Sequence, residues 1–401
     1  MLPLAGARNV NVLSTSIPVK TRTHKARRPL IHLIVGARPN FMKIAPLWHA
    51  LRRFEEEFEV AIVHTGQHYD DEMSDVFLRQ FGLPQPSHLL GIGSGSHAQQ
   101  TAAVMVAYEG ICTSKRPDWV VVVGDVNSTM AATIVAKKLV LPVAHLEAGL
   151  RSFDRTMPEE INRIVTDSIA DLLWTPSPDA DSNLLHEGVE SSKIERVGNI
   201  MIDAFEMLRT KIAAAVWPNT KGFAEQGYGV ATLHRPVNVD DPSQLARLVA
   251  ALERIAAKTA LVLPLHPRTR QRLEVAGLLT RLNNISQLNV LPPLGYVEFM
   301  NAVTSARFVL TDSGGVQEET TYLGIPCLTL RENTERPITI SQGSNRLVNL
   351  EILEIEISKV LTGPIRVGRR PELWDGKTAH RVVQSLRRRT VLQHDREEEI
   401  L

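Results

Sequence analysis

Short apolar runs alternate with stretches of helical periodicity along most of the chain. LIHLIV (30–35) is apolar and rich in β-branched residues, and Gly36 follows it, so a strand is predicted there. Residues 41–54 then place apolar side chains at helical spacing, and EVAIVH (59–64) is the next apolar run. This alternation predicts parallel strands joined by helices.

The same pattern continues through the rest of the chain. WVVVVGD (119–125) has the entirely apolar character of a strand that is buried on both faces of a parallel sheet. Further strands are predicted at 142–147, 172–175, 228–234, 260–266, 287–291, 308–312 and 326–330. Further helices are predicted over 70–81, 98–114, 158–170, 241–257, 296–305, 313–324 and 374–397. Two series of strand–helix units predict an α/β fold of two doubly wound Rossmann-like domains with a cleft between them, divided near 198–227.

The composition favours a small-molecule enzyme. The 401 residues carry 45 Lys or Arg against 44 Asp or Glu, so a net charge of +1 provides no general surface for nucleic acid. No apolar run is long enough to span a membrane, and two cysteines are too few for a disulfide scaffold. Residues 1–29 hold six Lys or Arg and no acid, and we interpret them as a disordered basic extension rather than a transit peptide. We therefore expect a cytoplasmic enzyme with no nucleic-acid or membrane partner.

Polar or ionisable residues follow nearly every predicted strand. Ligands of open parallel sheets bind outside the carboxyl ends of the strands, so these residues are candidates for one shared site. In chain order they are Arg38, Lys43, His64, Asp125, Glu147, His234, Arg235, His266, Asp312 and Ser313.

The motif DSGGVQEE (312–319) is the most informative local pattern. A strand, two glycines and a helix place the backbone N–H groups of Ser313, Gly314 and Gly315 at a helix N-terminus, which favours a phosphate. Glu318 and Glu319 lie one turn further along, where a carboxylate can hold a ribose diol. A tight turn with acids that suit the helix dipole is the alternative interpretation.

Three carboxylates are candidates for acid and base work. Asp125 and Glu147 end neighbouring apolar runs, and carboxylates held close together push one another's pKa apart. Glu159 is the third candidate, although it also fits the first turn of a helix capped by Thr156. His234 also fits a satisfied structural histidine.

Three cations are candidates for binding a diphosphate. Arg38 and Lys43 flank the start of the first helix, and Arg336 lies in RENTERP (331–337). Arginine suits bidentate contact with phosphate, but each of the three also fits a solvated surface position.

We expect no metal and no nicotinamide cofactor. His64 and His68 are spaced H-x3-H, but a glycine after a strand separates them, whereas zinc-binding pairs share a helix face. GIGSGSH (91–97) is Gly-rich without being a dinucleotide fingerprint. Cys112 and Cys327 lie in apolar surroundings and are interpreted as packing residues.

Taken together, these residues resemble the non-hydrolysing UDP-N-acetylglucosamine 2-epimerases. The resemblance covers residues 31–370, and its most specific segment is HLEAGLRSFDRTMPEEINR (145–163). The other matching segments are GARPNFMKIAP (36–46), TGQHYD (65–70), GDVNST (124–129), GNIMIDA (198–204), LHR (233–235), LTDSGGVQEE (310–319) and TERP (334–337).

The resemblance implies a fold like that of the B-type glycosyltransferases. Residues 30–200 would form the N-terminal domain and 201–374 the UDP-binding C-terminal domain, with the helix at 375–401 packing back on the first domain. It also implies a homodimer that uses a UDP-sugar and no cofactor. The implied activity is reversible C2 epimerisation of UDP-N-acetylglucosamine to UDP-N-acetylmannosamine, by elimination and re-addition of UDP through 2-acetamidoglucal, for cell-surface polysaccharide precursors.

The same resemblance implies roles for individual residues. The catalytic set is Asp125, Glu147, Glu159 and His234. The substrate-binding set is Arg38, Lys43, Arg151, Arg235, His266, Ser313, Gly314, Gly315, Glu319 and Arg336, with Glu319 on the ribose.

Four other functions stay open at this point. A glycosyltransferase of the same fold would need an acceptor, and the three carboxylates favour the epimerase. A relative could act on another UDP-sugar, such as a 2,3-diacetamido uronic acid. A hydrolysing epimerase would release UDP, and a binding module would leave the carboxylates idle.

The sequence departs from the resembled family at two positions that bear on regulation. Val237 stands where several members have a polar residue, and TGQHYDDEM (65–73) differs from the corresponding segment of members that UDP-N-acetylglucosamine activates.

We therefore expect a hyperbolic dependence of initial rate on UDP-N-acetylglucosamine concentration. A coupled assay over a hundredfold range of substrate checks this, and a sigmoidal curve would contradict it.

Overall fold

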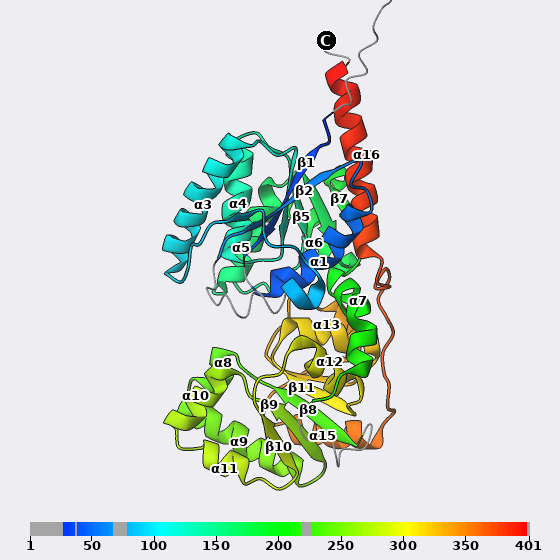
Figure 1. Cartoon of the computed structure of the whole chain (residues 1–401). Helices are drawn as coiled ribbons and strands as arrows, with labels where there is room; N and C mark the ends of the chain where they lie inside the picture. Colours follow the sequence, from blue (N-terminus) through cyan, green and yellow to red (C-terminus); the bar gives the residue numbers. More distant parts are fainter. Residues whose placement is uncertain (1–26, 37, 67–77, 218–226, 399–401) are drawn as a thin grey trace, which may run out of the picture.

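The computed structural model describes residues 27–36, 38–66, 78–217 and 227–398. Its first half is a sheet of seven parallel strands covered by helices (Figure 1). The elements are β1 (Leu30–Val35), α1 (Arg38–Arg52), β2 (Glu59–His64), β3 (His88–Leu89), α3 (His97–Ser114), β4 (Trp119–Val123), α4 (Asn127–Lys138), β5 (Val143–Leu146), α5 (Pro158–Ile169), β6 (Leu172–Thr175), α6 (Pro178–His186), a 3-10 turn (Ser191–Lys193) and β7 (Ile194–Arg196).

The second half is a sheet of six parallel strands. Its elements, with the helices α7 and α16 on either side, are α7 (Ile200–Ala214), β8 (Tyr228–Thr232), α8 (Pro236–Val239), α9 (Pro242–Ala256), β9 (Ala260–Pro264), α10 (Pro267–Val275), α11 (Leu279–Asn283), β10 (Leu288–Leu291), α12 (Tyr296–Thr304), β11 (Phe308–Thr311), α13 (Gly314–Leu323), β12 (Cys327–Leu330), α14 (Ile338–Ser341), β13 (Asn345–Val348), α15 (Leu353–Thr362) and α16 (Thr378–Glu398).

Both sheets reverse their strand order once. The first runs β3-β2-β1-β4-β5-β6-β7 and the second runs β10-β9-β8-β11-β12-β13. The reversals lie between β1 and β4 and between β8 and β11, which are the positions where doubly wound sheets bind ligands. The predicted α/β class with two doubly wound domains is confirmed.

Most predicted strands lie within a residue or two of the observed ones, and the predictions at 30–35 and 59–64 match β1 and β2. The first helix begins at Arg38, before the predicted 41–54, because a proline is tolerated in the first helical turn. Of the helix predicted over 70–81, residues 70–77 lie outside the described residues. The pattern missed α4, whose Ser, Thr and Ala residues give little apolar periodicity.

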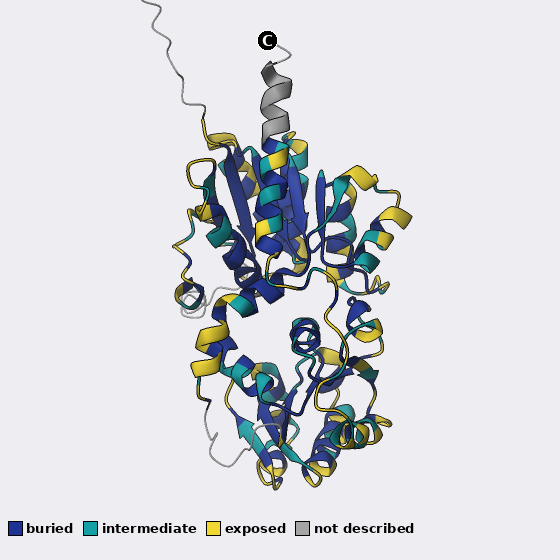
Figure 2. Ribbon diagram, turned by 90° about the vertical axis from the view of Figure 1, so that its right-hand side faces the viewer, coloured by how far each residue is buried: buried dark blue, intermediate teal, exposed yellow. Residues whose placement is uncertain are grey.

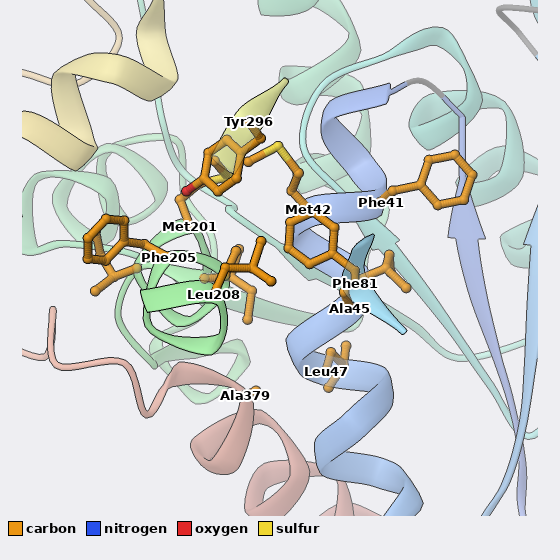
Figure 3. Close-up of a cluster of buried hydrophobic side chains, with 14 of the residues drawn as sticks. Phe41, Met42, Ala45, Leu47, Phe81, Met201, Phe205, Leu208, Tyr296 and Ala379 are labelled. Atoms are coloured by element: carbon orange, nitrogen blue, oxygen red, sulfur yellow. The ribbon is translucent and has the colours of Figure 1, made fainter. Parts of the chain in front are cut away.

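One apolar cluster belongs to both domains. It joins buried residues of α1, such as Phe41 and Leu47, to Phe205 and Leu208 of α7 and to Tyr296 of α12 (Figure 3). Helix α7 packs against α1 and α16 as well as against α12 and α13. The central strands of both sheets are buried, and exposed residues gather on the outer helices (Figure 2).

Helix α16 lies beside α1 and α7 (Figure 1). Asp203 of α7 caps its first turn, accepting hydrogen bonds from Thr378 N at 3.1 Å and Ala379 N at 2.7 Å. Trp174 Nε1 of β6 donates to Ser385 Oγ at 3.0 Å. The last described helix is therefore tied to the first domain.

Candidate active site

Two carboxylates stand at the carboxyl edge of the first sheet. Glu147 follows β5 and forms an ion pair with Lys43 of α1, and both side chains are at most 10% exposed. Asp125 follows β4 and forms an ion pair with Arg163 of α5. Glu147 has a φ of 71°, a conformation that costs energy for a residue with a Cβ and is typical of functional sites.

Gly124 is required where these groups converge. Its φ is 69°, and an added Cβ would lie 2.9 Å from Lys43 Nζ and 3.4 Å from Glu147 Oε2. Asn40 donates from Nδ2 to Val123 O at 2.9 Å, so it supports the end of β4. The glycine leaves room for the ion pair beside the backbone.

Helix α5 positions Asp125 through both its backbone and its side chain. Asn162 Nδ2 donates to Asp125 O at 2.9 Å, while Arg163 binds the carboxylate. Burial disfavours the ionised form, but the charges of Arg163, Lys43 and Arg336 hold the pKa of Asp125 below its usual value. The carboxylate is 23% exposed, so a ligand can still reach it.

A histidine occupies the corresponding edge of the second sheet. His234 follows β8, and its Nδ1 lies 3.1 Å from Asp312 Oδ1 at the end of β11. Asp312 also accepts hydrogen bonds from His234 N, Arg235 N and Asn238 Nδ2 at 2.9–3.1 Å. The buried aspartate orients the histidine, whose ring centroid lies 5.0 Å from that of His266.

The N-terminus of α13 lies beside Arg336. Ser313 is the N-cap residue, and a Cβ added at Gly314 would lie 2.6 Å from Arg336 Nη1. Arg336 Nε lies 2.8 Å from Glu318 Oε1, and Arg336 Nη1 lies 2.6 Å from Glu335 Oε1. Two carboxylates therefore hold one guanidinium beside backbone N–H groups that are suited to an anion.

Charges of the two domains act on one another at this point. Burial lowers the pKa of Arg336, but Glu318, Glu335, Glu147 and Asp125 together raise it above its usual range. Burial also raises the pKa of Glu318, where the charge of Arg336 opposes the effect and that of Glu147 adds to it. We call Lys43, Asp125, Glu147, Arg163, Glu318, Glu335 and Arg336 the charged cluster. Its members come from the carboxyl edges of both sheets.

Glu319 faces a different neighbour from Glu318. Tyr296 of α12 donates from its hydroxyl to Glu319 Oε1 at 2.8 Å. The carboxyl is 4% exposed, and burial raises its pKa to about 8. The second oxygen of Glu319 can form a hydrogen bond with a further hydroxyl, such as one of a ribose.

The structure separates some predicted site residues from this cluster. Arg151, expected to bind substrate, is 1% exposed and pairs with Asp167 at 2.8 Å and with Glu187 at 2.7 Å, neither of which belongs to the charged cluster. Glu159 is exposed in the first turn of α5, and no described residue forms a hydrogen bond or an ion pair with it. Arg38 begins α1, but its side chain lies outside the described residues.

Arg235 lies nearer to the cluster than His266 does. Its Nη2 is 3.9 Å from Glu335 Oε1, whereas His266 caps α10 by accepting from Arg268 N at 3.2 Å.

Several contributors were missed by the sequence analysis. Arg163, Asn162 and Glu335 all lie inside the quoted segments, but no spacing rule distinguishes them. Their roles come from contacts between segments far apart in the chain.

A pocket borders this site, because Arg331 in its lining lies 2.9 Å from Glu335 of the charged cluster. The pocket, of about 420 Å³, opens between α8, α9 and the ends of β12 and β13, beside Asn238 and Arg331. Within the described ranges, His, Cys, Asp and Glu side chains form no group that could hold a metal ion. Among the helices of those ranges, none is long and apolar enough to cross a membrane.

The protein has two doubly wound α/β domains, and carboxylates, arginines and a helix N-terminus meet at one edge. This is the class of α/β protein that is suited to a phosphorylated ligand. The chain matches the family model described as UDP-N-acetylglucosamine 2-epimerase over residues 49–387. It belongs to that family, and the resemblance is confirmed.

Individual relatives are similar over nearly their whole length. The UDP-N-acetylglucosamine 2-epimerase of Methanocaldococcus jannaschii is 40% identical, over 89% of this chain and 98% of that protein. The crystal structure of that enzyme in complex with UDP-GlcNAc and UDP has a TM-score of 0.80, covering 89% of this chain and 99% of that one. The UDP-2,3-diacetamido-2,3-dideoxy-D-glucuronate 2-epimerase of Pseudomonas aeruginosa is 42% identical, over 79% and 87%.

Glu319 predicts a pH-dependent contribution to folding stability. Its pKa is about 8 in the folded protein and 4.5 as an ordinary glutamate, so folding retains a proton. This stabilisation is full below pH 4.5 and is lost as the pH rises through 8. The free energy of unfolding in urea should fall between about pH 5 and pH 9. In Glu319→Gln this fall should be smaller by about 2–4 kcal/mol.

Glu298→Gln on α12 is the matched control, because Glu298 is only half-buried. It should retain the wild-type dependence on pH. Equal slopes for wild type and Glu319→Gln would contradict the prediction.

Proposed function

We propose that this protein interconverts UDP-N-acetylglucosamine and UDP-N-acetylmannosamine. The observation that carries the proposal is the charged cluster, in which Asp125 and Glu147 of one domain lie within electrostatic reach of Arg336 of the other. Family membership supports the substrate class. An anion at the start of α13 would stand between these groups.

The second domain supplies groups that suit the leaving UDP. Breaking the C1–O bond leaves the electron pair on the diphosphate, where donors and cations are most stabilising. The backbone N–H groups at Gly314 and Gly315, the guanidinium of Arg336 and the imidazole of His234 are the candidates. Glu319 beside Tyr296 is the candidate for the ribose.

The first domain supplies carboxylates that suit proton transfer. The C2 proton is not adjacent to a carbonyl, so its loss is coupled to departure of UDP and leaves a C1–C2 double bond in 2-acetamidoglucal. The proton passes to a base, a second group returns a proton to the opposite face of C2, and the UDP oxygen re-forms the bond to C1. Asp125 and Glu147 are the candidates, with Glu159 on the exposed rim.

The location, the oligomeric state and the cofactor requirement of the enzyme are part of the same proposal. We place it in the cytoplasm as a homodimer that needs no cofactor, on the family resemblance. In this proposal the UDP-N-acetylmannosamine formed is used for cell-surface polysaccharide precursors.

A second substrate is favoured by one specific finding. The relative that acts on a 2,3-diacetamido uronic acid is 42% identical, close to the 40% of the archaeal epimerase. The C2 chemistry would be unchanged, and only the groups around C3 and C6 of the sugar would differ.

Proton NMR in D2O tests the function directly. With UDP-N-acetylglucosamine, EDTA and no nicotinamide, we expect UDP-N-acetylmannosamine carrying deuterium at C2, without an acceptor. Unchanged anomeric signals, together with turnover of the 2,3-diacetamido uronate, would move the assignment to the second substrate. Release of free UDP at one equivalent per turnover would indicate hydrolysis instead.

Arg163 should keep the pKa of Asp125 low. Arg163→Met removes the nearest positive charge, so the pKa of Asp125 rises and the acidic limb of kcat/KM moves to higher pH. We expect a loss of about 100-fold in kcat/KM, with partial recovery in Arg163→Lys.

Arg196→Met is the control, because it removes an ion pair with Asp181, measured at 2.5 Å, at the edge strand β7. Its pH profile should match that of the wild type. An acidic limb that stays in place in Arg163→Met would show that the arginine does not tune Asp125.

A further inference from the structure

Phe153 is exposed and held in a conformation that phenylalanine disfavours. Its φ is 60° and its exposed fraction is 76%. A bulky side chain in the left-handed region is a genuine outlier, and the ring gains no burial here to offset that cost. Such strain persists where the surrounding structure imposes it, and it clusters at functional sites.

The surrounding structure does impose it. Glu160, only 2% exposed, accepts hydrogen bonds from Ser152 N at 2.8 Å, Ser152 Oγ at 2.9 Å and Phe153 N at 3.1 Å. Ser152 Oγ in turn accepts from Asp154 N at 3.2 Å. These hydrogen bonds restrain the backbone at Phe153 and direct its side chain outward from the loop.

The position of the loop indicates what the ring meets. Residues 147–157 connect β5 to α5 at the carboxyl edge of the sheet, where ligands of doubly wound folds bind. The loop begins at Glu147 of the charged cluster and leads to Glu159. The segment that carries Phe153 thus starts at a residue of the charged cluster and ends beside Glu159 on the exposed rim.

We infer that Phe153 is a substrate-contact residue whose ring packs against the hexose of the UDP-sugar rather than against the nucleotide. This inference rests on the proposed function and deepens it. A hexose has apolar C–H faces, and binding sites place rigid aromatic rings against such surfaces. The uridine and the diphosphate are assigned to the second domain, so the exposed ring of the first domain is left for the sugar.

The inference predicts opposite effects on stability and on sugar binding. Phe153→Gly relieves the left-handed strain, so its Tm should rise by about 2 °C. The same variant and Phe153→Ala should bind UDP-N-acetylglucosamine roughly five- to tenfold more weakly, as measured by calorimetry. The Kd of UDP should stay within about twofold of the wild-type value. Phe153→Tyr and Phe153→Trp should restore sugar binding.

Val140→Gly is the matched control. Val140 also has a positive φ, 55°, and is 80% exposed, but it precedes β5 at the amino edge of the sheet. Its Tm should rise in the same way, with both ligands bound as in the wild type.

The inference is overturned if wild type and Phe153→Ala have equal affinities for the sugar nucleotide. It is also overturned if Phe153→Ala loses as much affinity for UDP as for the sugar nucleotide. The inference is also overturned if the wild type binds UDP-N-acetylglucosamine no more tightly than UDP. Dissociation of an oligomer in Phe153→Ala, seen by light scattering with sugar binding unchanged, would assign the ring to an interface between copies. Absence of C2 deuteration in the wild type would refute the proposed function alone, because the two affinities still decide the role of Phe153.

Discussion

The apolar cluster shared by α1, α7, α12 and α16 is the constraint on which the rest of the structure depends. It packs Phe41 and Leu47 of the first domain against Phe205 of α7 and Tyr296 of the second domain (Figure 3). Because this core is continuous, the carboxyl edges of two separate sheets are kept together. The ring of Tyr296 belongs to the cluster while its hydroxyl binds Glu319, so the packing of the domains and one wall of the site share a side chain.

Charge compensation across the domains follows from that packing. A buried ion is costly unless opposite charges and hydrogen bonds surround it. Lys43, Arg163 and Arg336 each face carboxylates, and Arg336 is held by Glu318 and Glu335 of its own domain while Asp125 and Glu147 act on it from the other. An anionic ligand placed among these groups would redistribute the pairs, which links binding to the state of ionisation of the carboxylates.

Local strain marks the same region of the first domain. Glu147 and Phe153 both have positive φ and lie on the loop that follows β5. Helix α5 stabilises this loop through Glu160 and stabilises Asp125 through Asn162 and Arg163. One helix therefore supports two parts of the site, and the energy stored in the loop is offset by hydrogen bonds made one turn into that helix.

The sequence alone determined the fold class and the edge at which the site lies. Apolar runs that alternate with helical periodicity leave few folds besides a doubly wound one, and ionisable residues after β1, β4, β5, β8 and β11 must fall on carboxyl edges. Local pattern did not decide which of those residues meet. Arg151, predicted to bind substrate, pairs with Asp167 and Glu187 in the structure. Glu318 and Glu319 were predicted together as ribose ligands, but Glu318 pairs with Arg336 of the charged cluster while Glu319 meets Tyr296. Partners of a charged side chain come from other segments of the chain, and only tertiary packing sets their distance and burial.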